Sequence, residues 1–337
     1  MTYDVTLIPG DGIGPEITEQ TVRAVEATGV KFSWDVQTAG MAAVTLHGDP
    51  LPEPTLASIR ARKVALKGPL TTPVGEGYRS VNVALRKEFE LYANVRPAVT
   101  ILPGRYDQVD IVLVRENVEG LYSGVEHFIK VGDDPRAVGI SQAIVTRLAC
   151  ERIVRYAFEY ALRHGRKKVA IVHKANILKM ASGLFLEAGR AVAKEYEGRV
   201  AAGDMIVDNC AMQLVLKPEQ YDNNVTTNLF GDILSDEISG LVGGLGLTPG
   251  GNIGTGSAIF EAVHGSAPDI AGKGVANPSA QMLAAAMMLD HLGELAAAAR
   301  LRRAIGTTIR EAGIRTRDLG GSAGTREFGD AVAARLG

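Results

Sequence analysis

Short apolar segments typical of β-strands alternate with amphipathic, helix-like segments along this 337-residue chain, and this alternation limits the possible folds more than any other feature. Strand-like segments are found at residues 3–8, 63–67, 110–114 and 168–173. A long amphipathic helix is expected at about 141–164, with an apolar stripe formed by Ile144, Leu148, Val154, Phe158 and Leu162. Strands and helices that alternate in this way pack as a sheet covered by helices. We therefore predict an α/β protein, and its length indicates about two domains, each with its own core.

The composition argues against several classes of partner. A hydrophobic fraction of 46% and a charged fraction of 22% are those of an ordinary soluble domain. The net charge of −2, without a basic block, gives no support for binding to nucleic acid or to a membrane surface. The longest apolar run, residues 282–289, is too short to span a bilayer, and the first residues lack the features of a signal peptide. We predict a soluble, cytoplasmic protein without nucleic-acid or membrane partners.

The two cysteines, Cys150 and Cys210, are far apart in the sequence and form no CxxC motif. A zinc site or a disulfide framework is therefore not expected. The simplest prediction is two buried thiols in a reducing compartment.

The N-terminal segment VTLIPGDGIGPEI, residues 5–17, predicts a strand, a glycine turn and a helix with Pro15 in its first turn. Its spacing, G-x-G-x-G-P, differs from the G-x-G-x-x-G of Rossmann dinucleotide-binding domains. No acidic residue closes a second strand at the expected distance either. A Rossmann-type site is therefore not predicted here.

A second segment, residues 226–254, carries two aspartates, Asp232 and Asp236, at the start of an apolar-periodic stretch. On a helix this spacing places both carboxylates on one face, one turn apart. Magnesium and similar hard cations bind carboxylate oxygens arranged in this way. A solvated acidic helix start is the structural alternative, but it does not explain the uncharged, glycine-rich run that follows at residues 240–256.

Three arginines, Arg86, Arg96 and Arg115, each lie beside an expected turn or strand end. Brought together, three guanidinium groups would bind a substrate with several carboxylates through paired hydrogen bonds. Considered singly, each arginine is more typical of a surface residue.

Four further residues are candidates for chemistry. Lys174 follows an apolar strand, where partial burial would suit it to proton transfer, although a surface lysine is the alternative. Tyr122, Asp208 and His264 lie at turns or helix starts. Their structural alternatives are ordinary packing, an N-cap and a turn histidine, respectively.

Taken together, these segments resemble the β-decarboxylating dehydrogenases of 2-hydroxy acids, a family that comprises isocitrate, isopropylmalate, homoisocitrate and tartrate dehydrogenases. The resemblance covers essentially the whole chain, and the motifs follow one another in the family's order. They are GDGIGPE (10–16), GPLTTP (68–73), LRKxxxLYANVRP (85–97), RENVEGLYSG (115–124), HKANILK (173–179), NLFGDILSDEISGLVGGLG (228–246), EAVHGSAPDIAG (261–272) and NP (277–278). NLFGDILSD is the most specific of them.

The resemblance assigns roles to residues. Asp232 and Asp236 match metal-binding aspartates, and Asp208 matches a third that comes from the other subunit. Tyr122 and Lys174 match the catalytic tyrosine and lysine, and the lysine also reaches across from the partner subunit. The resemblance therefore implies Mg²⁺ or Mn²⁺ as cofactor and a homodimer with shared active sites, and leaves open whether dimers pair into a tetramer.

The fold implied by the resemblance is a three-layer α/β/α fold, not of the Rossmann type. Residues 1–94 and 243–337 would form a large domain on the cofactor side. Residues 95–119 and 147–242 would form a small domain with the metal, the substrate and the dimer interface. An inserted clasp at 120–146 would join two subunits.

The substrate choice rests on Ser80 and Asn82, which precede Arg86. A hydroxyl and an amide here can hydrogen-bond a third carboxylate, whereas an isopropyl group would leave them unpaired. The isocitrate branch of the family has serine and asparagine at these positions, and its arginines corresponding to Arg86, Arg96 and Arg115 hold the malate portion of the substrate. Homoisocitrate, one methylene longer, is the nearest alternative, followed by isopropylmalate.

The cofactor choice rests on Asp269 and Ile270, which replace a Lys-Tyr pair of NADP-dependent relatives. A carboxylate accepts hydrogen bonds from ribose hydroxyls and repels a 2′-phosphate, so we predict NAD. Basic residues that could favour a 2′-phosphate follow at Arg310, Arg315 and Arg317. The residues expected to contact the cofactor are Thr72, Asn176, Glu261, His264, Gly265, Ser266, Ala267, Asp269, Ile270 and Asn277.

The leading prediction is therefore an NAD-dependent isocitrate dehydrogenase that converts isocitrate to 2-oxoglutarate and CO2. A rival of another class is a non-catalytic regulatory subunit of a hetero-oligomer. Such a subunit would be expected to lose part of the metal or proton-transfer set, and all of that set is present here. A purely structural protein would leave the arginines, aspartates and glycine loops unexplained.

Overall fold

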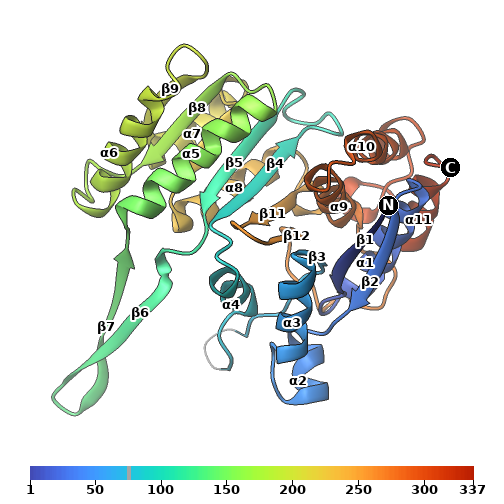
Figure 1. Cartoon of the computed structure of the whole chain (residues 1–337), viewed down its shortest axis with the longest axis horizontal. Coiled ribbons are helices and arrows are strands. Elements are labelled where there is room, and N and C mark those ends of the chain that lie inside the picture. The colour runs from blue at the N-terminus through green and yellow to red at the C-terminus, as the bar shows by residue number, and fades with distance from the viewer. Residues whose placement is uncertain (74–76) are drawn as a thin grey trace. The chain divides into compact units, whose positions relative to one another are not determined.

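The structure, a computed structural model, describes residues 1–73 and 77–337 (Figure 1). The chain divides into two compact units. Unit 1 comprises residues 1–91, 96–109 and 239–337, so it contains both chain ends, and unit 2 comprises residues 92–95 and 110–238. The predicted α/β class is confirmed.

Residues 96–109 were predicted to belong to the small domain, which was expected to comprise residues 95–119 and 147–242. In the compact units, residues 96–109 belong with the chain ends. Within this segment the Thr100 amide donates to the carbonyl of Val109 at 2.8 Å, which closes the loop on itself. The domain boundaries given above remain a prediction.

Unit 1 is built on a mixed sheet with the strand order β2-β1-β3-β12-β11. β1 pairs in parallel with β2 and β3, and β12 is parallel to β3 but antiparallel to β11. This order differs from that of a Rossmann sheet. The strands are β1 (Thr2–Ile8), β2 (Lys31–Val36), β3 (Val64–Lys67), β11 (Pro249–Ile253) and β12 (Ala258–Ala262).

Helices cover both faces of this sheet because its strands are apolar on both sides. Leu66 of β3 packs into a core with four helices, whereas its neighbour Ala65 packs with Ile59 and Leu85 on the opposite face. The four helices are α1 (Gly14–Ala27), α9 (Ser279–His291), α10 (Leu295–Arg310) and α11 (Thr325–Ala333). The opposite face carries α3 (Glu53–Arg62) and α4 (Val81–Glu88), and a short helix, α2 (Met41–His47), precedes them. Unit 1 therefore has the expected three layers.

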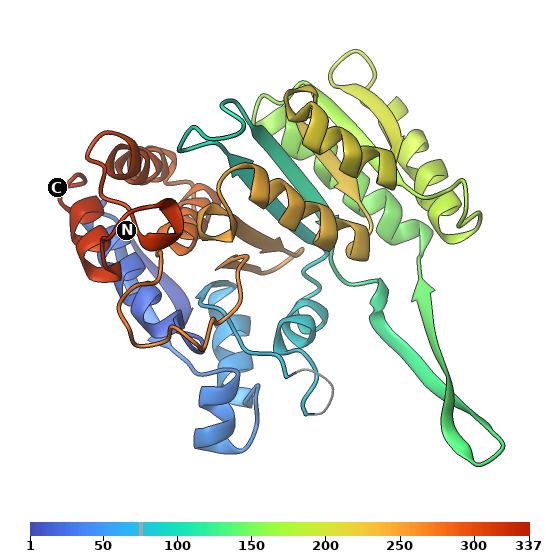
Figure 2. The same ribbon diagram turned by 180° about the vertical axis from the view of Figure 1, so that it is seen from behind.

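Unit 2 has a parallel sheet in the order β5-β10-β8-β9, with β4 (Ala93–Val99) next to β5. These strands are β5 (Asp110–Glu116), β8 (Lys168–His173), β9 (Ala201–Ile206) and β10 (Asn223–Thr226). Figures 1 and 2 show its helices on both faces. One face carries α5 (Arg147–Arg163) and α6 (Ala181–Lys194), and the other carries α7 (Val207–Leu216) and α8 (Asn228–Leu241).

The predicted helix start at residue 141 was wrong. Residues 120–144 form an antiparallel hairpin of β6 (Gly120–Val131) and β7 (Asp134–Ile144), and α5 begins only at Arg147. Thr146 caps this helix by accepting a hydrogen bond from the amide of Ala149 at 3.2 Å. Leu148, expected in the apolar stripe, is 73% exposed. The hairpin confirms the clasp inferred for this part of the chain.

Cys150 and Cys210 are free and buried, as predicted. Burial raises the pKa of each thiol to about 12, so neither ionises readily. In the part of the chain that the structure describes, no helix is long and apolar enough to cross a membrane.

Candidate active site

The centre of the candidate site is the Asp232 carboxylate on α8. Arg115 of β5 donates a hydrogen bond from Nη1 to its Oδ1, and Tyr122 of β6 donates its hydroxyl to its Oδ2. The Arg115 guanidinium also lies 5.0 Å from the centre of the Tyr122 ring. Three residues predicted separately from the sequence are thus brought into one cluster within unit 2.

Arg115 is held rigidly, because only 1% of its surface is exposed. Its Nε and Nη2 donate to Oδ1 of Asn228 at 3.1 and 2.7 Å, and Asn228 in turn donates to the carbonyl of Glu119 at 3.0 Å. The arginine stem lies against Gly231, where an added Cβ would come within 2.5 Å of the arginine Cγ. Asn228 was missed in the sequence, and its position at the first residue of the NLFGDILSD motif was the available signal.

The phenol of Tyr122 is protonated at neutral pH. Burial raises its pKa above the ordinary value of about 10, and the hydrogen bond to Asp232 raises it further. The nearby Arg115 charge acts in the opposite direction but does not outweigh these effects. Tyr122 is therefore suited to donate a proton, not to accept one.

Asp236 lies one turn after Asp232 on α8 and is exposed. The donor chemistry fits a hard divalent cation, since the cluster offers carboxylate oxygens at helical spacing. Among residues 1–73 and 77–337, however, no group of three or more His, Cys, Asp or Glu side chains could by itself hold a metal. The metal site, with Asp208 supplied by a partner subunit, stays a prediction.

Asp208 and Lys174 form an ion pair within unit 2. Asp208 is the second residue of α7 and not its N-cap, and the bond from Lys174 lowers the pKa of its carboxyl group. Lys174 follows β8, and its amide donates to the Ser182 hydroxyl at 2.7 Å, which fixes the backbone at this point.

In unit 1, Arg86 belongs to a buried charge network. Glu261 lies 2.5 Å from the Lys67 ammonium and 4.0 Å from the Arg86 guanidinium, and it accepts from Asn252 at 2.7 Å. Burial alone would raise the pKa of Glu261, but the two cations and the hydrogen bonds outweigh it and hold the pKa at about 2. Lys67 was missed in the sequence, although a lysine that ends a fully buried strand is a usable signal.

Ser80 and Asn82 both lie at the start of α4. The Ser80 hydroxyl caps the helix by accepting from the amide of Val83 at 3.5 Å, and it accepts from Thr72 at 3.4 Å. The side-chain oxygen of Asn82 is buried and has no hydrogen-bond donor among the described residues. Arg96 is buried in β4.

The expected cofactor residues lie mostly in unit 1. The Ser266 and Thr71 hydroxyls are 2.7 Å apart, and Asn277 donates to Asp318 at 2.8 Å. Burial lowers the pKa of His264, which keeps its imidazole neutral. Gly265 and Asp269 are exposed, Ala267 has a φ of 39°, and Ile270 packs with the side chains of Ile13 and Ile17. Asn176 is exposed and belongs to unit 2.

The side chain of Arg315, one of the basic residues that could favour NADP, makes a hydrogen bond within the protein. Its Nε donates to the carbonyl of Ile309 at 2.8 Å. Arg310 and Arg317 are exposed.

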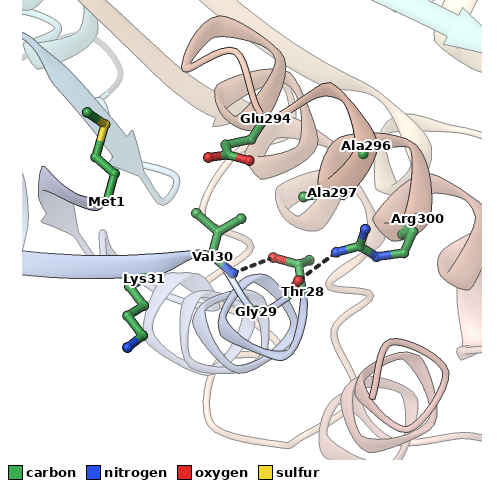
Figure 3. A pocket seen from close by; sticks show the side chains of 9 residues that line it. All are labelled: Met1, Thr28, Gly29, Val30, Lys31, Glu294, Ala296, Ala297 and Arg300. Atoms are coloured by element: carbon green, nitrogen blue, oxygen red, sulfur yellow. Dashed lines mark hydrogen bonds between the residues drawn. The ribbon is translucent and has the colours of Figure 1, made fainter.

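A pocket of about 400 Å³ on unit 1 contains none of the predicted site residues (Figure 3). In this pocket the Arg300 guanidinium donates a hydrogen bond to the carbonyl of Thr28 at 2.6 Å, so it has a partner within the protein. The pocket is lined by Met1, Thr28, Gly29, Val30, Lys31, Glu294, Ala296, Ala297 and Arg300.

Comparison with known proteins identifies the class. A family model described as isocitrate/isopropylmalate dehydrogenase matches residues 4–332, which makes the protein an enzyme of the β-decarboxylating dehydrogenase class. The chain belongs to the isocitrate/isopropylmalate dehydrogenase family. Enzymes of this family use a nicotinamide dinucleotide and a divalent metal and are typically dimeric.

Three similar proteins illustrate the range of the family. The chain is 49% identical to the mitochondrial NAD isocitrate dehydrogenase catalytic subunit 5 of Arabidopsis thaliana, over 98% of this chain and 88% of that protein. It is 48% identical to an isocitrate/homoisocitrate dehydrogenase of Thermus thermophilus, over 100% of this chain and 99% of that protein. A crystal structure of isocitrate dehydrogenase from Methylococcus capsulatus matches with a TM-score of 0.96 and 57% identity, over 99% of each chain.

Replacing Gly231 with alanine should displace Arg115 and disorganise the cluster. The new methyl group would overlap the arginine stem, so we expect a loss of about 1–3 kcal/mol of stability and a large fall in turnover. Gly240→Ala on the same helix is the matched control, because an added Cβ there meets nothing within 4 Å. Thermal unfolding and steady-state kinetics of both variants provide the test. Equal behaviour of the two would contradict the proposed role of the contact.

Proposed function

We propose that this protein is an NAD-dependent isocitrate dehydrogenase, which oxidises and decarboxylates isocitrate to 2-oxoglutarate and CO2 with the help of Mg²⁺ or Mn²⁺. The observation that carries the substrate choice is the polar start of α4. The buried Asn82 oxygen lacks a donor among the described residues, and Ser80 presents a hydroxyl beside it. An isopropyl group would leave this amide unpaired at a cost of about 1–3 kcal/mol. A third carboxylate can pair with the amide after rotation about its last bond.

Charge recognition in this proposal falls to the arginines. Arg86, Arg96 and Arg115 bind the carboxylates of the malate portion. Asn228 already fixes the side chain of Arg115 in the free protein. Little side-chain entropy of Arg115 would therefore be lost when the substrate binds. Ser80 and Asn82 would hold the remaining carboxylate.

Proton transfer falls to Lys174 and Tyr122. Lys174 takes the hydroxyl proton, directly or through water, as hydride leaves the same carbon for the nicotinamide. After the β-carboxylate is lost, Tyr122 gives its phenolic proton to carbon. Its raised pKa keeps that proton in place until this step.

The metal would be held by Asp232 and Asp236 of one subunit and Asp208 of its partner. When bound, a divalent cation supplies positive charge that stabilises oxygen anions of the substrate. The positive charge of Arg115 already lies against the Asp232 carboxylate. The hydrogen bond between them also restricts rotation of the carboxylate. The protein would therefore act as a homodimer, in which Lys174 and Asp208 serve the partner's site.

NAD is favoured by the exposed carboxylate of Asp269, which would accept bonds from ribose hydroxyls and repel a 2′-phosphate. The adenosine would lie against His264, Gly265, Ser266 and Asn277, and the nicotinamide near Thr72. The contacts expected of Asn176, Glu261, Ala267 and Ile270 are part of the same proposal. The cytoplasmic location is likewise a prediction.

Two alternatives stay open. Homoisocitrate differs from isocitrate by one methylene, which discriminates only about ten- to two-hundredfold, and the Thermus relative carries both substrates in its name. A regulatory subunit would bind similar ligands without turnover. The complete set of Tyr122, Lys174 and the three aspartates favours catalysis.

The direct test measures NADH or NADPH formation with each of isocitrate, homoisocitrate, isopropylmalate and tartrate, in the presence of Mg²⁺ or Mn²⁺. The expected result is the highest kcat/KM for isocitrate with NAD. Turnover of homoisocitrate in preference to isocitrate would establish the first alternative. Binding of isocitrate without turnover of any substrate would establish a regulatory subunit.

Tyr122→Phe should lower kcat by about 10²- to 10⁴-fold, because it removes the proton donor while keeping the ring against Arg115. In the wild-type enzyme the raised phenol pKa predicts that loss of kcat through ionisation of this group begins at a higher pH than for an ordinary tyrosine, because the phenol keeps its proton longer as the pH rises. Tyr160→Phe, on α5, is the control, because Tyr160 stacks on His164 and has no proposed catalytic role. A kcat within twofold of wild type in Tyr122→Phe would remove the tyrosine from the mechanism.

The double change Asp269→Lys with Ile270→Tyr should shift the preference toward NADP by at least tenfold in the ratio of kcat/KM values. A lysine can pair with the 2′-phosphate that the aspartate repels. The measurement is kcat/KM for both dinucleotides at constant metal and isocitrate. An unchanged ratio would mean that the ribose pocket lies elsewhere.

A further inference from the structure

In the turn GDGIG, residues 10–14, three backbone amides donate hydrogen bonds to carbonyl groups of the protein. The amide of Asp11 donates to the carbonyl of Pro69 at 2.7 Å, that of Ile13 to the carbonyl of Ser266 at 2.9 Å, and that of Gly14 to the carbonyl of Asp11 at 2.8 Å. A phosphate cradle at a helix start needs such amides to be available. The turn therefore has another role.

The Asp11 side chain is the most connected part of the turn. It is 6% exposed, and its carboxylate accepts hydrogen bonds from the backbone amides of Thr71, Met41 and Ala42 at 2.8, 3.1 and 3.1 Å. Bonds to an ionised carboxylate are roughly twice as strong as those between neutral groups. The carboxylate thus ties together segments 10–14, 40–42 and 68–73.

Thr71 extends the connection to a fourth segment. Its hydroxyl lies 2.7 Å from the Ser266 hydroxyl, and its carbonyl accepts from Tyr78 at 2.9 Å. The Cα of Gly12 lies against the backbone of Ser266, where any side chain would overlap the carbonyl oxygen. The loop at 68–73 carries Thr72, expected near the nicotinamide, and the loop at 261–272 carries the residues expected around the adenosine.

We infer that Asp11 is a positioning residue for the dinucleotide: it fixes the nicotinamide loop at 68–73 against the adenosine loop at 261–272 before the cofactor binds. This inference rests on the proposed function. Both loops lie in unit 1, and Asp11 and Thr71 form a continuous path between them. A site whose loops are held in place in the free protein loses less entropy on binding than one that must order them.

The test is Asp11→Asn, which keeps the shape of the side chain but removes its charge and presents an NH2 group to at least one backbone amide. NADH binding, followed by its fluorescence without metal or substrate, should weaken about tenfold, or about 1.4 kcal/mol. In steady state, KM for NAD should rise by a similar factor, whereas kcat and KM for isocitrate should stay within about threefold.

Asp35→Asn is the matched control. Asp35 is another carboxylate of unit 1, with bonds from Ser58 at 2.6 Å and Arg62 at 3.0 Å on α3, and it contacts neither cofactor loop. Its replacement should lower the unfolding temperature without changing NADH affinity. Equal loss of stability in the two variants, with NADH binding unchanged in both, would overturn the inference and leave Asp11 a structural residue.

Thr71→Val gives a second approach if Asp11→Asn does not fold. It keeps the amide bonded to Asp11 but removes the hydroxyl bond to Ser266, and NADH binding should weaken about threefold or more. The two changes should be non-additive in the double variant, because both act on one path. Unchanged NADH binding in Thr71→Val would overturn the inference. Failure of the wild-type protein to bind NADH would instead refute the proposed function.

Discussion

The candidate site depends on one carboxylate, that of Asp232, which receives Arg115 and Tyr122 on its two oxygens. The arginine offsets the charge of the carboxylate, and the hydrogen bond from Tyr122 adds to the effect of burial in raising the pKa of the phenol. Without Asp232, Arg115 would be an unpaired cation with 1% of its surface exposed, which is a costly state. The position of this aspartate on α8 therefore compensates the buried charge of Arg115 and helps to keep Tyr122 protonated.

The second buried charge cluster, in unit 1, follows the same physical rule. Glu261 is buried, yet Lys67 and Arg86 keep it ionised, and Asn252 donates a further hydrogen bond to its carboxylate. A buried carboxylate is tolerated only when its partners offset the cost of desolvation. Glu261 therefore offsets the charge of both cations, and a change at Glu261 would leave Lys67 and Arg86 without their buried counter-charge.

Much of the fold could be predicted from the sequence because several of its strands are short, apolar and bounded by turn residues, as in β5 and β8. The start of α5 could not, since apolar residues such as Ile144 and Leu148 fit a helical stripe although one is in a strand and the other is exposed. The site residues were recognised through ordered motifs. Their partners were not, because Arg115 and Asp232 are 117 positions apart and no local pattern encodes which carboxylate an arginine meets.

The GDGIG turn shows why a motif must be judged by its spacing and its contacts. With Rossmann spacing, the glycines would expose amides to a phosphate. Here the glycine at position 12 lets the turn approach Ser266, and Asp11 uses its carboxylate to hold backbone amides of other segments. An acidic side chain at this place would also repel phosphate. In the role inferred for Asp11, the turn serves dinucleotide binding indirectly, because it fixes the loops that are proposed to contact the cofactor.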